Sequence, residues 1–170
     1  KNTEILEELA YKDKLTNIYN RRKFDELLQV EYKRSLRYSR NLSVIFLDID
    51  YFKKINDNFG HDIGDLVLSE LAHFIKLHVR DTDIFARWGG EEFIAILKLN
   101  STDELQIISE KLRNLVQNSF YEKNNISINV TISIGGTMFQ EDEDVNETIH
   151  RADQLMYQSK QNGKNQSTIK

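Results

Sequence analysis

The sequence of 170 residues contains no cysteine and no proline. The absence of cysteine excludes disulfides, a thiol nucleophile and a cysteine metal site. The absence of proline means that turns must be built from Gly, Asn and Asp. No apolar run approaches the roughly 20 residues that a membrane-spanning helix needs, and no secretory signal pattern is visible at the N-terminus.

An excess of positive charge is also lacking. The chain has 23 Lys and Arg against 27 Asp and Glu, a formal net charge of −4. We therefore expect no general nucleic-acid binding, although a local basic pocket for phosphates is compatible with this charge. The length and the 39% hydrophobic content suit one domain with a single core. Because the first residue is Lys1, we expect the chain to be part of a longer protein.

Apolar residues at helical spacing predict five helices. They are a short N-terminal helix with Ile5, Leu6 and Leu9 on one face that stops near Asp13, a helix from about Arg21 to Arg40, one carrying Leu66 to Val79, one after a capping box of Ser101 and Glu104, and one between Asp144 and Gly163. In the second helix the residues expected to face inward are Phe24, Leu27, Leu28 and Leu36.

Runs of β-branched and aromatic residues predict the strands. They are a buried strand over residues 42–47 that ends at Asp48, a hairpin formed by residues 83–88 and 93–97, and a strand over residues 126–134 with one face in water. A polar stretch from Asp50 to Gly64 follows the first strand. Since a hairpin interrupts the alternation of strands and helices, we predict an α/β sandwich with a largely antiparallel sheet rather than a doubly wound parallel one.

Three carboxylates fall where a sheet exposes side chains at its rim. Asp48 ends the buried strand, and Glu91 and Glu92 lie in the tight turn of the hairpin. If the hairpin pairs beside the first strand, these groups converge and repel one another unless a cation lies between them. Magnesium is the natural candidate, because it takes oxygen ligands and shares them with phosphates. The alternative is a solvated turn whose glycines provide positive φ.

The polar stretch contains candidates for recognition of a nucleotide. Asn56 both donates and accepts, and Asp65 accepts from two adjacent N–H groups, which suits the edge of guanine. Lys53 and the backbone N–H groups of Tyr51 and Phe52 can meet phosphate oxygens. Near the end of the last helix, Lys160 and Lys164 offer further positive charge for phosphates. Each of these residues taken alone is more often a turn former or a helix-end charge.

Five segments in order resemble the GGDEF family of diguanylate cyclases, over nearly the whole chain. They are residues 13–22, 48–57 and 60–65, the signature Gly89-Gly90-Glu91-Glu92-Phe93 in its Glu form, and residues 152–165. Lys14 and Asn17 depart from the family, which usually has Pro and Gly at these positions. Asn tolerates left-handed φ, so we expect the turn to survive.

The resemblance implies both a fold and roles for these residues. The fold would be the palm-like sandwich of nucleotidyl cyclases, with residues 1–12 ending a signalling helix and residues 13–170 forming the catalytic domain. Two Mg²⁺ ions per site, with Mn²⁺ as a substitute, would be held by Asp48, the carbonyl of Ile49, Glu91 and Glu92, and Glu91 would also be the base for the ribose 3′-hydroxyl. The remaining roles would be guanine binding by Asn56, Asp65 and Leu15, phosphate binding by Phe52, Lys53, Lys160 and Lys164, and product inhibition at Arg80 and Asp83.

The implied reaction condenses two GTP into cyclic di-GMP across a homodimer and releases two pyrophosphates. An upstream sensory module would control how often two domains meet. The domain is expected in the cytoplasm, with any membrane anchor upstream. Two alternatives remain: a catalytically silent module that binds GTP or cyclic di-GMP, and a polymerase palm, for which the sequence shows no basic template surface.

Overall fold

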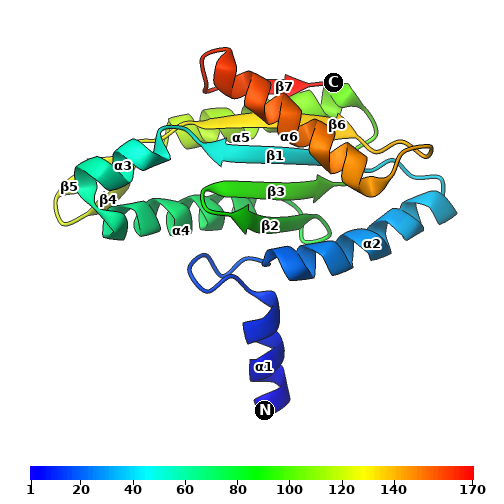
Figure 1. The fold of residues 1–170 in the computed structure, drawn as a ribbon, viewed down its shortest axis with the longest axis horizontal. Coiled ribbons are helices and arrows are strands. Elements are labelled where there is room, and N and C mark those ends of the chain that lie inside the picture. Colours follow the sequence, from blue (N-terminus) through cyan, green and yellow to red (C-terminus); the bar gives the residue numbers. More distant parts are fainter.

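The computed structural model describes residues 1–170, apart from the side chain of Glu8. In chain order the elements are α1 (Asn2–Tyr11), α2 (Arg21–Arg37), β1 (Ser43–Ile49), α3 (Phe52–Phe59), α4 (His61–His78), β2 (Ile84–Gly89), β3 (Glu92–Leu97), α5 (Thr102–Gln117), β4 (Tyr121–Lys123), β5 (Ile126–Ile128), β6 (Ile132–Met138), α6 (Val145–Gln161) and β7 (Ser167–Ile169). Figure 1 shows their arrangement around one central sheet.

The central sheet has five strands in the order β2-β3-β1-β6-β7. Every neighbouring pair is antiparallel except β6 and β7, which run parallel. The predicted hairpin is confirmed as β2 and β3, and it pairs directly with β1. The separate two-stranded sheet of β4 and β5 lies at the same end of the molecule as α3 (Figure 1), and β4 contacts α4. The expected α/β sandwich with a largely antiparallel sheet is confirmed.

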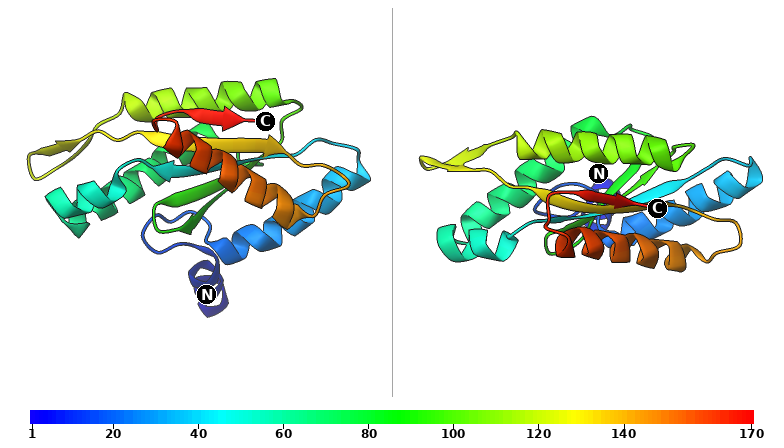
Figure 2. Two further views of the ribbon diagram at one scale, coloured as in Figure 1. Left: turned by 45° about the horizontal axis from the view of Figure 1, so that its top comes forward. Right: turned by 90° about the horizontal axis from the view of Figure 1, so that it is seen from above.

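Helices cover both faces of the sheet (Figure 2). One core joins α4 and α5 to the first face, with Leu47, Leu71 and Leu105 fully buried. The second core joins α2 and α6 to the opposite face around Phe24 and Phe46. Adjacent residues of β1 therefore point into different cores, as the pleat of a strand requires. Because β1 is buried on both faces, its continuously apolar sequence is explained.

The single strand predicted over residues 126–134 is wrong. The chain forms β5 and then β6, which belong to different sheets. Between them, the Asn129 side-chain amide donates to the carbonyls of Gln117 and Ser119 at 2.6 and 2.8 Å. These two bonds tie the chain to the end of α5 and interrupt the strand. The alternation of apolar residues continued across this break, so the sequence pattern did not reveal it.

Three smaller expectations also need correction. The polar positions of β6 are not in water, because Ser133 is buried and donates to the buried Asp50. Leu36 is 44% exposed rather than inward, since it lies roughly 80° around the helix from Leu28. The polar stretch over residues 50–64 is largely helical, as α3 and the start of α4. Its few apolar residues gave too weak a periodicity to predict these helices.

The N-terminal helix α1 stands away from the rest of the molecule (Figure 1). Its apolar residues Ile5, Leu6 and Leu9 are 57%, 65% and 57% exposed. In the linker that follows, Asn17 has a φ of 60°, so the expected left-handed turn forms without glycine. Among the residues described, no helix combines the length and apolar character needed to cross a membrane.

Candidate active site

Asp48, Glu91 and Glu92 meet where β1 ends and the β2–β3 hairpin turns. Asp48 lies directly opposite Glu92 in the antiparallel register. The Ile49 amide donates to the Glu91 carbonyl at 3.3 Å, so the turn lies against the end of β1. The turn uses a φ of 49° at Gly90, a conformation that favours glycine. The convergence predicted from the sequence is present.

A fourth carboxylate, Asp153 of α6, lies close enough to add to the repulsion. Burial raises the pKa of Asp48 to about 6 against the opposing charge of Lys160, and Glu91 contributes to the increase. Burial also raises the pKa of Glu92 to about 7, together with repulsion from Asp48 and Asp153. We call Asp48, Glu91, Glu92 and Asp153 the acidic rim. Its oxygen-only donors and their mutual repulsion fit a divalent cation.

Lys160 of α6 supplies the positive charge that lies at this rim. Its Nζ donates to Asp48 Oδ1 at 3.0 Å and to the Ile49 carbonyl at 3.2 Å, and it lies 2.9 Å from Asp50 Oδ1. A lysine ammonium has three N–H donors, so all three have an oxygen partner. No three Asp, Glu or His side chains in the described part of the chain are grouped closely enough to hold a metal ion without rearrangement.

Asp50, one residue after β1, forms a buried node beneath the rim. Its side chain is 0% exposed and accepts from the hydroxyls of Ser133 at 2.6 Å and Thr131 at 2.7 Å. The Asn165 amide donates to it at 2.9 Å. Burial opposes ionisation, but these hydrogen bonds and Lys160 hold the pKa of Asp50 below its usual range. The node joins β1, β6, α6 and the loop after α6.

Arg87 clamps the hairpin turn from the other side. It donates to the Gly90 carbonyl through Nε at 3.0 Å and Nη2 at 2.8 Å, and its Nη1 lies 3.2 Å from Asp13 Oδ2. Asp13 also accepts from the amide and hydroxyl of Thr16. Burial opposes ionisation of Asp13, but the bonds from Thr16 and the charge of Arg87 keep its pKa low. The turn is thus tied to the linker between α1 and α2.

The residues proposed to bind guanine gather around the start of α4. A Cβ at Gly64 would lie 1.8 Å from Asn56 Oδ1 and 3.3 Å from Phe52 Cζ, so only glycine permits this close packing of α3 on α4. Asp65 follows directly and is exposed. One turn later, Ser69 donates to the carbonyl of Leu15 at 3.0 Å and so places Leu15 beside the same helix. The structure brings these predicted residues together.

Fewer direct contacts join the residues predicted to bind phosphate. Tyr51 has a φ of 58° and precedes α3, and no side chain caps the N-terminus of that helix. Lys53 in its first turn is exposed. Lys164 follows α6, with its Nζ 3.9 Å from the centre of the Tyr51 ring. The ammonium of Lys54 lies 4.7 Å from the centre of the same ring. The N-terminus of α3, Lys54 and Lys164 therefore surround Tyr51, a suitable arrangement for an anion.

The predicted pair Arg80 and Asp83 lies at the opposite end of β2. Asp83 is only 8% exposed, and its two oxygens accept from the backbone amides of Arg80 at 3.0 Å and Lys98 at 3.3 Å. Arg80 itself is exposed. Asp83 therefore holds the backbone of this corner, while the Arg80 side chain borders a groove of about 400 Å³ that Lys98 and Lys111 also line.

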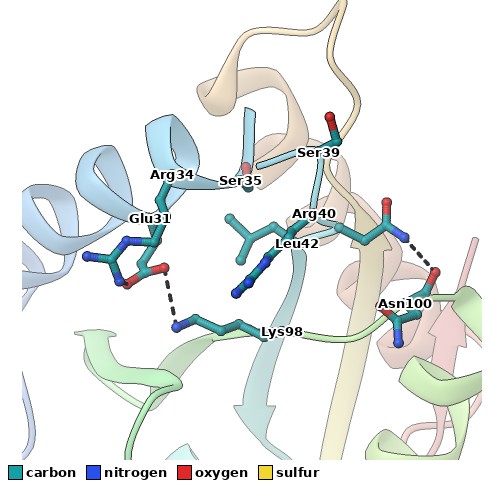
Figure 3. Close-up of a pocket in the computed structure, with 9 residues that line it drawn as sticks. Glu31, Arg34, Ser35, Ser39, Arg40, Leu42, Lys98 and Asn100 are labelled. Carbon is teal, nitrogen blue, oxygen red and sulfur yellow. Dashed lines mark hydrogen bonds and ion pairs between the residues drawn. The ribbon is translucent and has the colours of Figure 1, made fainter. Parts of the chain in front are cut away.

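Another hollow, of about 300 Å³, lies between the end of α2 and the start of β1 (Figure 3). Glu31 pairs with Arg34 at 3.2 Å and with Lys98 at 3.4 Å. This hollow lies at the end of β1 opposite Asp48, and none of the predicted catalytic or binding residues lines it. We therefore assign it no catalytic role. The hollow of about 900 Å³ at the acidic rim is lined by two of the residues predicted to bind metal, Asp48 and Glu92.

Sequence reasoning missed three residues of this site and one contact. Asp153 and Asp50 were quoted within motifs but given no role, and Arg87 was not singled out. Arg87 stands two residues before the glycine pair, which was the only local clue. The contact of Lys160 with Asp48 links residues 112 positions apart, and no local pattern indicates such a pairing.

Comparison with known proteins agrees with this geometry. A model of the family described as diguanylate cyclase, GGDEF domain, matches residues 10–166. Diguanylate cyclase A of Treponema denticola is 38% identical over 99% of this chain and 46% of its own length. The response regulator PleD of Caulobacter vibrioides is 40% identical over 93% of this chain and 36% of its own. The chain thus spans less than half of either relative.

A solved structure gives the same result for the fold. The coiled coil and GGDEF domain of DgcB from Caulobacter crescentus, in complex with c-di-GMP, superposes with a TM-score of 0.93. The alignment has 28% sequence identity and covers 99% of this chain and 90% of that one. The palm-like fold expected from the resemblance is confirmed.

Proposed function

The chain belongs to the GGDEF family of diguanylate cyclases, and we propose that it condenses two molecules of GTP into cyclic di-GMP with release of two pyrophosphates. The observation that carries this proposal is the pairing of Asp48 with Glu92 beside the Glu91 turn. Repelling carboxylates at a sheet edge, next to a niche suited to guanine, match the needs of phosphoryl transfer.

The metal ligands in this proposal are Asp48, the carbonyl of Ile49, Glu91 and Glu92. Their oxygen donors suit two Mg²⁺ ions, with Mn²⁺ as a substitute. Bound metal would stabilise the charge that develops on the transferring phosphoryl group. The chain's own contribution is placement: the β1–β3 register fixes Asp48 against Glu92, and Arg87 fixes the turn that carries Glu91.

Nucleotide binding would use the niche at the start of α4 and the loop around Tyr51. Asn56 and Asp65 are proposed to bind the guanine edge, with Leu15 against the base. The phosphates would be met by the backbone at Phe52 and by three lysines, which are Lys53, Lys160 and Lys164. Base choice follows, because ATP would leave the carboxylate of Asp65 without the N–H partners that guanine offers.

Each domain would hold one GTP and supply half of the reaction centre. Two domains then meet antiparallel, and each ribose 3′-oxygen attacks the α-phosphorus held by the other. The new bond joins oxygen to phosphorus, pyrophosphate leaves, and the hydroxyl proton passes to the Glu91 carboxylate. Positioning supplies much of the rate, because the reaction becomes effectively intramolecular once both domains are aligned.

Control by other parts of a longer protein is also proposed. The apolar residues of α1 are exposed, which suits a signalling helix that pairs with a second copy. An upstream sensory module would act through this helix, and the domain would work in the cytoplasm, with any membrane anchor upstream. Cyclic di-GMP would bind at the Arg80 and Asp83 corner and hold two domains with their turns apart. No nucleic-acid partner is expected.

Incubation with GTP and Mg²⁺, with products separated by chromatography, tests the activity. The expected result is cyclic di-GMP and pyrophosphate. Binding of GTP without turnover by the dimeric protein would contradict the proposal and favour the silent binding module. Calorimetric titration with GTP and ATP tests base choice: we expect GTP to bind more tightly by about 1–3 kcal/mol, and equal affinities would contradict the roles of Asn56 and Asp65.

A further inference from the structure

Lys160 holds the same oxygens that the proposed function assigns to the metal. Its ammonium contacts Asp48 Oδ1 at 3.0 Å and the Ile49 carbonyl at 3.2 Å. Its third contact is Asp50 Oδ1 at 2.9 Å. The side chains of Lys160 and Asp48 are only 18% and 13% exposed, so water weakens this pairing little. The ammonium occupies a cation position built from two carboxylates and a carbonyl.

This arrangement cannot persist when a metal and a triphosphate are both bound. All three N–H donors of Lys160 have oxygen partners. A phosphate contact from Lys160 therefore requires it to release at least one of these oxygens. A divalent ion bound to Asp48 would also repel an ammonium held by the same carboxylate.

We infer that Lys160 acts as an exchangeable counter-cation, which metal displaces from Asp48 and which then moves to the phosphates of GTP. Metal alone must release the ammonium without offering it a new partner. Metal together with a triphosphate provides that partner. Metal and nucleotide therefore bind with positive cooperativity, and each raises the affinity for the other by the same factor.

The surroundings of the two aspartates support this exchange. Asp50 keeps three further donors, from Ser133, Thr131 and Asn165, and so remains satisfied after Lys160 leaves. Among the described residues, Lys160 is the side chain that bonds to Asp48. Departure of the ammonium thus frees Asp48 for metal and leaves the hydrogen bonds of Asp50 to Ser133, Thr131 and Asn165 in place.

Lys164 provides a matched control within the same segment. It has the same charge and lies four residues later, but its ammonium is over the Tyr51 ring at 3.9 Å and has no carboxylate partner among the described residues. It is proposed to bind phosphate as Lys160 does. A change that affects only phosphate binding should therefore appear equally in variants of either lysine, whereas an effect on metal alone should be confined to Lys160.

The test measures Mn²⁺ affinity by electron paramagnetic resonance at pH 8, with and without a non-hydrolysable GTP analogue. Without nucleotide, Lys160→Met should bind Mn²⁺ on the order of tenfold more tightly than the parent. The nucleotide should then improve its Mn²⁺ affinity less than it does for the parent. Lys164→Met should keep the parent's nucleotide-free affinity for Mn²⁺. Lys160→Arg retains the positive charge and should bind Mn²⁺ as weakly as the parent does.

Unchanged or weaker nucleotide-free Mn²⁺ binding by a folded Lys160→Met protein overturns the exchange. Circular dichroism establishes folding, and if the Met variant is unfolded, Lys160→Gln takes its place with the same expectation. The inference rests on the proposed metal ligands, so the parent's turnover of GTP is measured separately. If the parent turns over GTP but Lys160→Met binds Mn²⁺ with the parent's nucleotide-free affinity, the exchange is wrong and the proposed function stands. A parent that neither binds Mn²⁺ nor turns over GTP removes both proposals.

Discussion

The two ends of the β2–β3 hairpin treat buried carboxylates in opposite ways. At the turn, burial and mutual repulsion raise the pKa of Asp48 to about 6 and that of Glu92 to about 7. At the far end, Asp83 is buried, but each of its oxygens accepts from a backbone amide. The carboxylates at the turn repel one another, whereas both oxygens of Asp83 at the far end have hydrogen-bond donors.

This difference separates chemistry from architecture in a single hairpin. A carboxylate bonded to backbone amides stabilises the fold and has fewer lone pairs to offer a ligand. Carboxylates that repel one another cost stability, and such groups gather where a cation or a substrate relieves them. The turn is therefore expected to govern activity and the far corner to govern stability, and variants at each end test this division.

The largest expected effect is at the turn. Asp48→Asn and Glu91→Gln should each reduce turnover of GTP by on the order of 10³ or more, because each removes charge from the proposed metal site. Neither should lower the melting temperature, since each also removes repulsion. Turnover assays and thermal melts measure the two quantities. Glu141→Gln, an exposed carboxylate between β6 and α6, is the control, and near-normal turnover in either rim variant would contradict the metal assignment.

The corner should show the reverse pattern. Asp83→Ala leaves the amides of Arg80 and Lys98 without their acceptor, which costs about 1–3 kcal/mol for each buried group left unpaired. For a domain of this size each kcal/mol lowers the melting temperature by about 2–4 °C. Turnover by the protein that remains folded should persist. Asp83→Asn keeps one acceptor oxygen and should lose less, and equal stability of Asp83→Ala and the parent would refute the architectural role.

The contrast between the two ends also shows what the sequence could reveal. Asp48 and Glu91 were predictable, because a buried apolar run and a glycine turn place both at a sheet edge. The hydrogen bonds of Asp83 were not predictable, since its partner amide at Lys98 follows the neighbouring strand β3 and lies 15 positions away. For the same reason Arg87 and Asp13 went unrecognised as a clamp: the contact joins residues 74 positions apart, and charged pairs at such separation leave no periodic pattern.

The parts of the fold that were predicted correctly have local sequence patterns, and the parts that were missed depend on distant contacts or are very short. The hairpin and the helices other than α3 have strong local periodicity, and the antiparallel sheet follows from the hairpin's position in the chain. The break at Asn129 depends on side-chain bonds to the end of α5, so the alternation across it was misleading. The short strands β4 and β7 have three residues each, too few to give a pattern.

The carboxylates at the turn should also make the stability of the metal-free protein depend on pH. Asp48 and Glu92 have folded pKa values above their usual range, so between about pH 4 and 7 the folded state binds more protons than the unfolded state. Stability from these groups is lost as the pH rises through that window. Melting temperatures measured in EDTA should therefore rise as the pH falls from 8 to 5.

Asp48→Asn should flatten this pH dependence of the melting temperature. Mg²⁺ added at pH 8 should raise the melting temperature of the parent.

The contribution of Asp13 to stability depends on pH with the opposite sign. Because its pKa is lowered in the folded state, this stability is lost only as the pH falls below the usual value near 4. A parent whose stability is constant or increases from pH 5 to pH 8 in EDTA would show that the rim carboxylates are not strained by burial and repulsion.

The smallest expected effect concerns the Arg80 side chain, the one group of the corner that is free to meet a ligand. Because Asp83 fixes the backbone and leaves Arg80 exposed beside a groove with two lysines, the guanidinium can take guanine O6 and N7 together. A bidentate contact of this kind is worth about 1–3 kcal/mol. Arg80→Ala should weaken binding of cyclic di-GMP about tenfold, and inhibition by added product should weaken in parallel, while turnover without product is retained.

Arg22→Ala is the control. Arg22 lies in α2 with a side chain that is 72% exposed, and its removal should leave product binding unchanged. Calorimetry with cyclic di-GMP, paired with turnover assays at increasing product, measures both effects. Undiminished inhibition in Arg80→Ala would place product binding elsewhere. The division between the two ends would then still hold for Asp83, whose contribution is measured by stability alone, but the corner would be purely architectural.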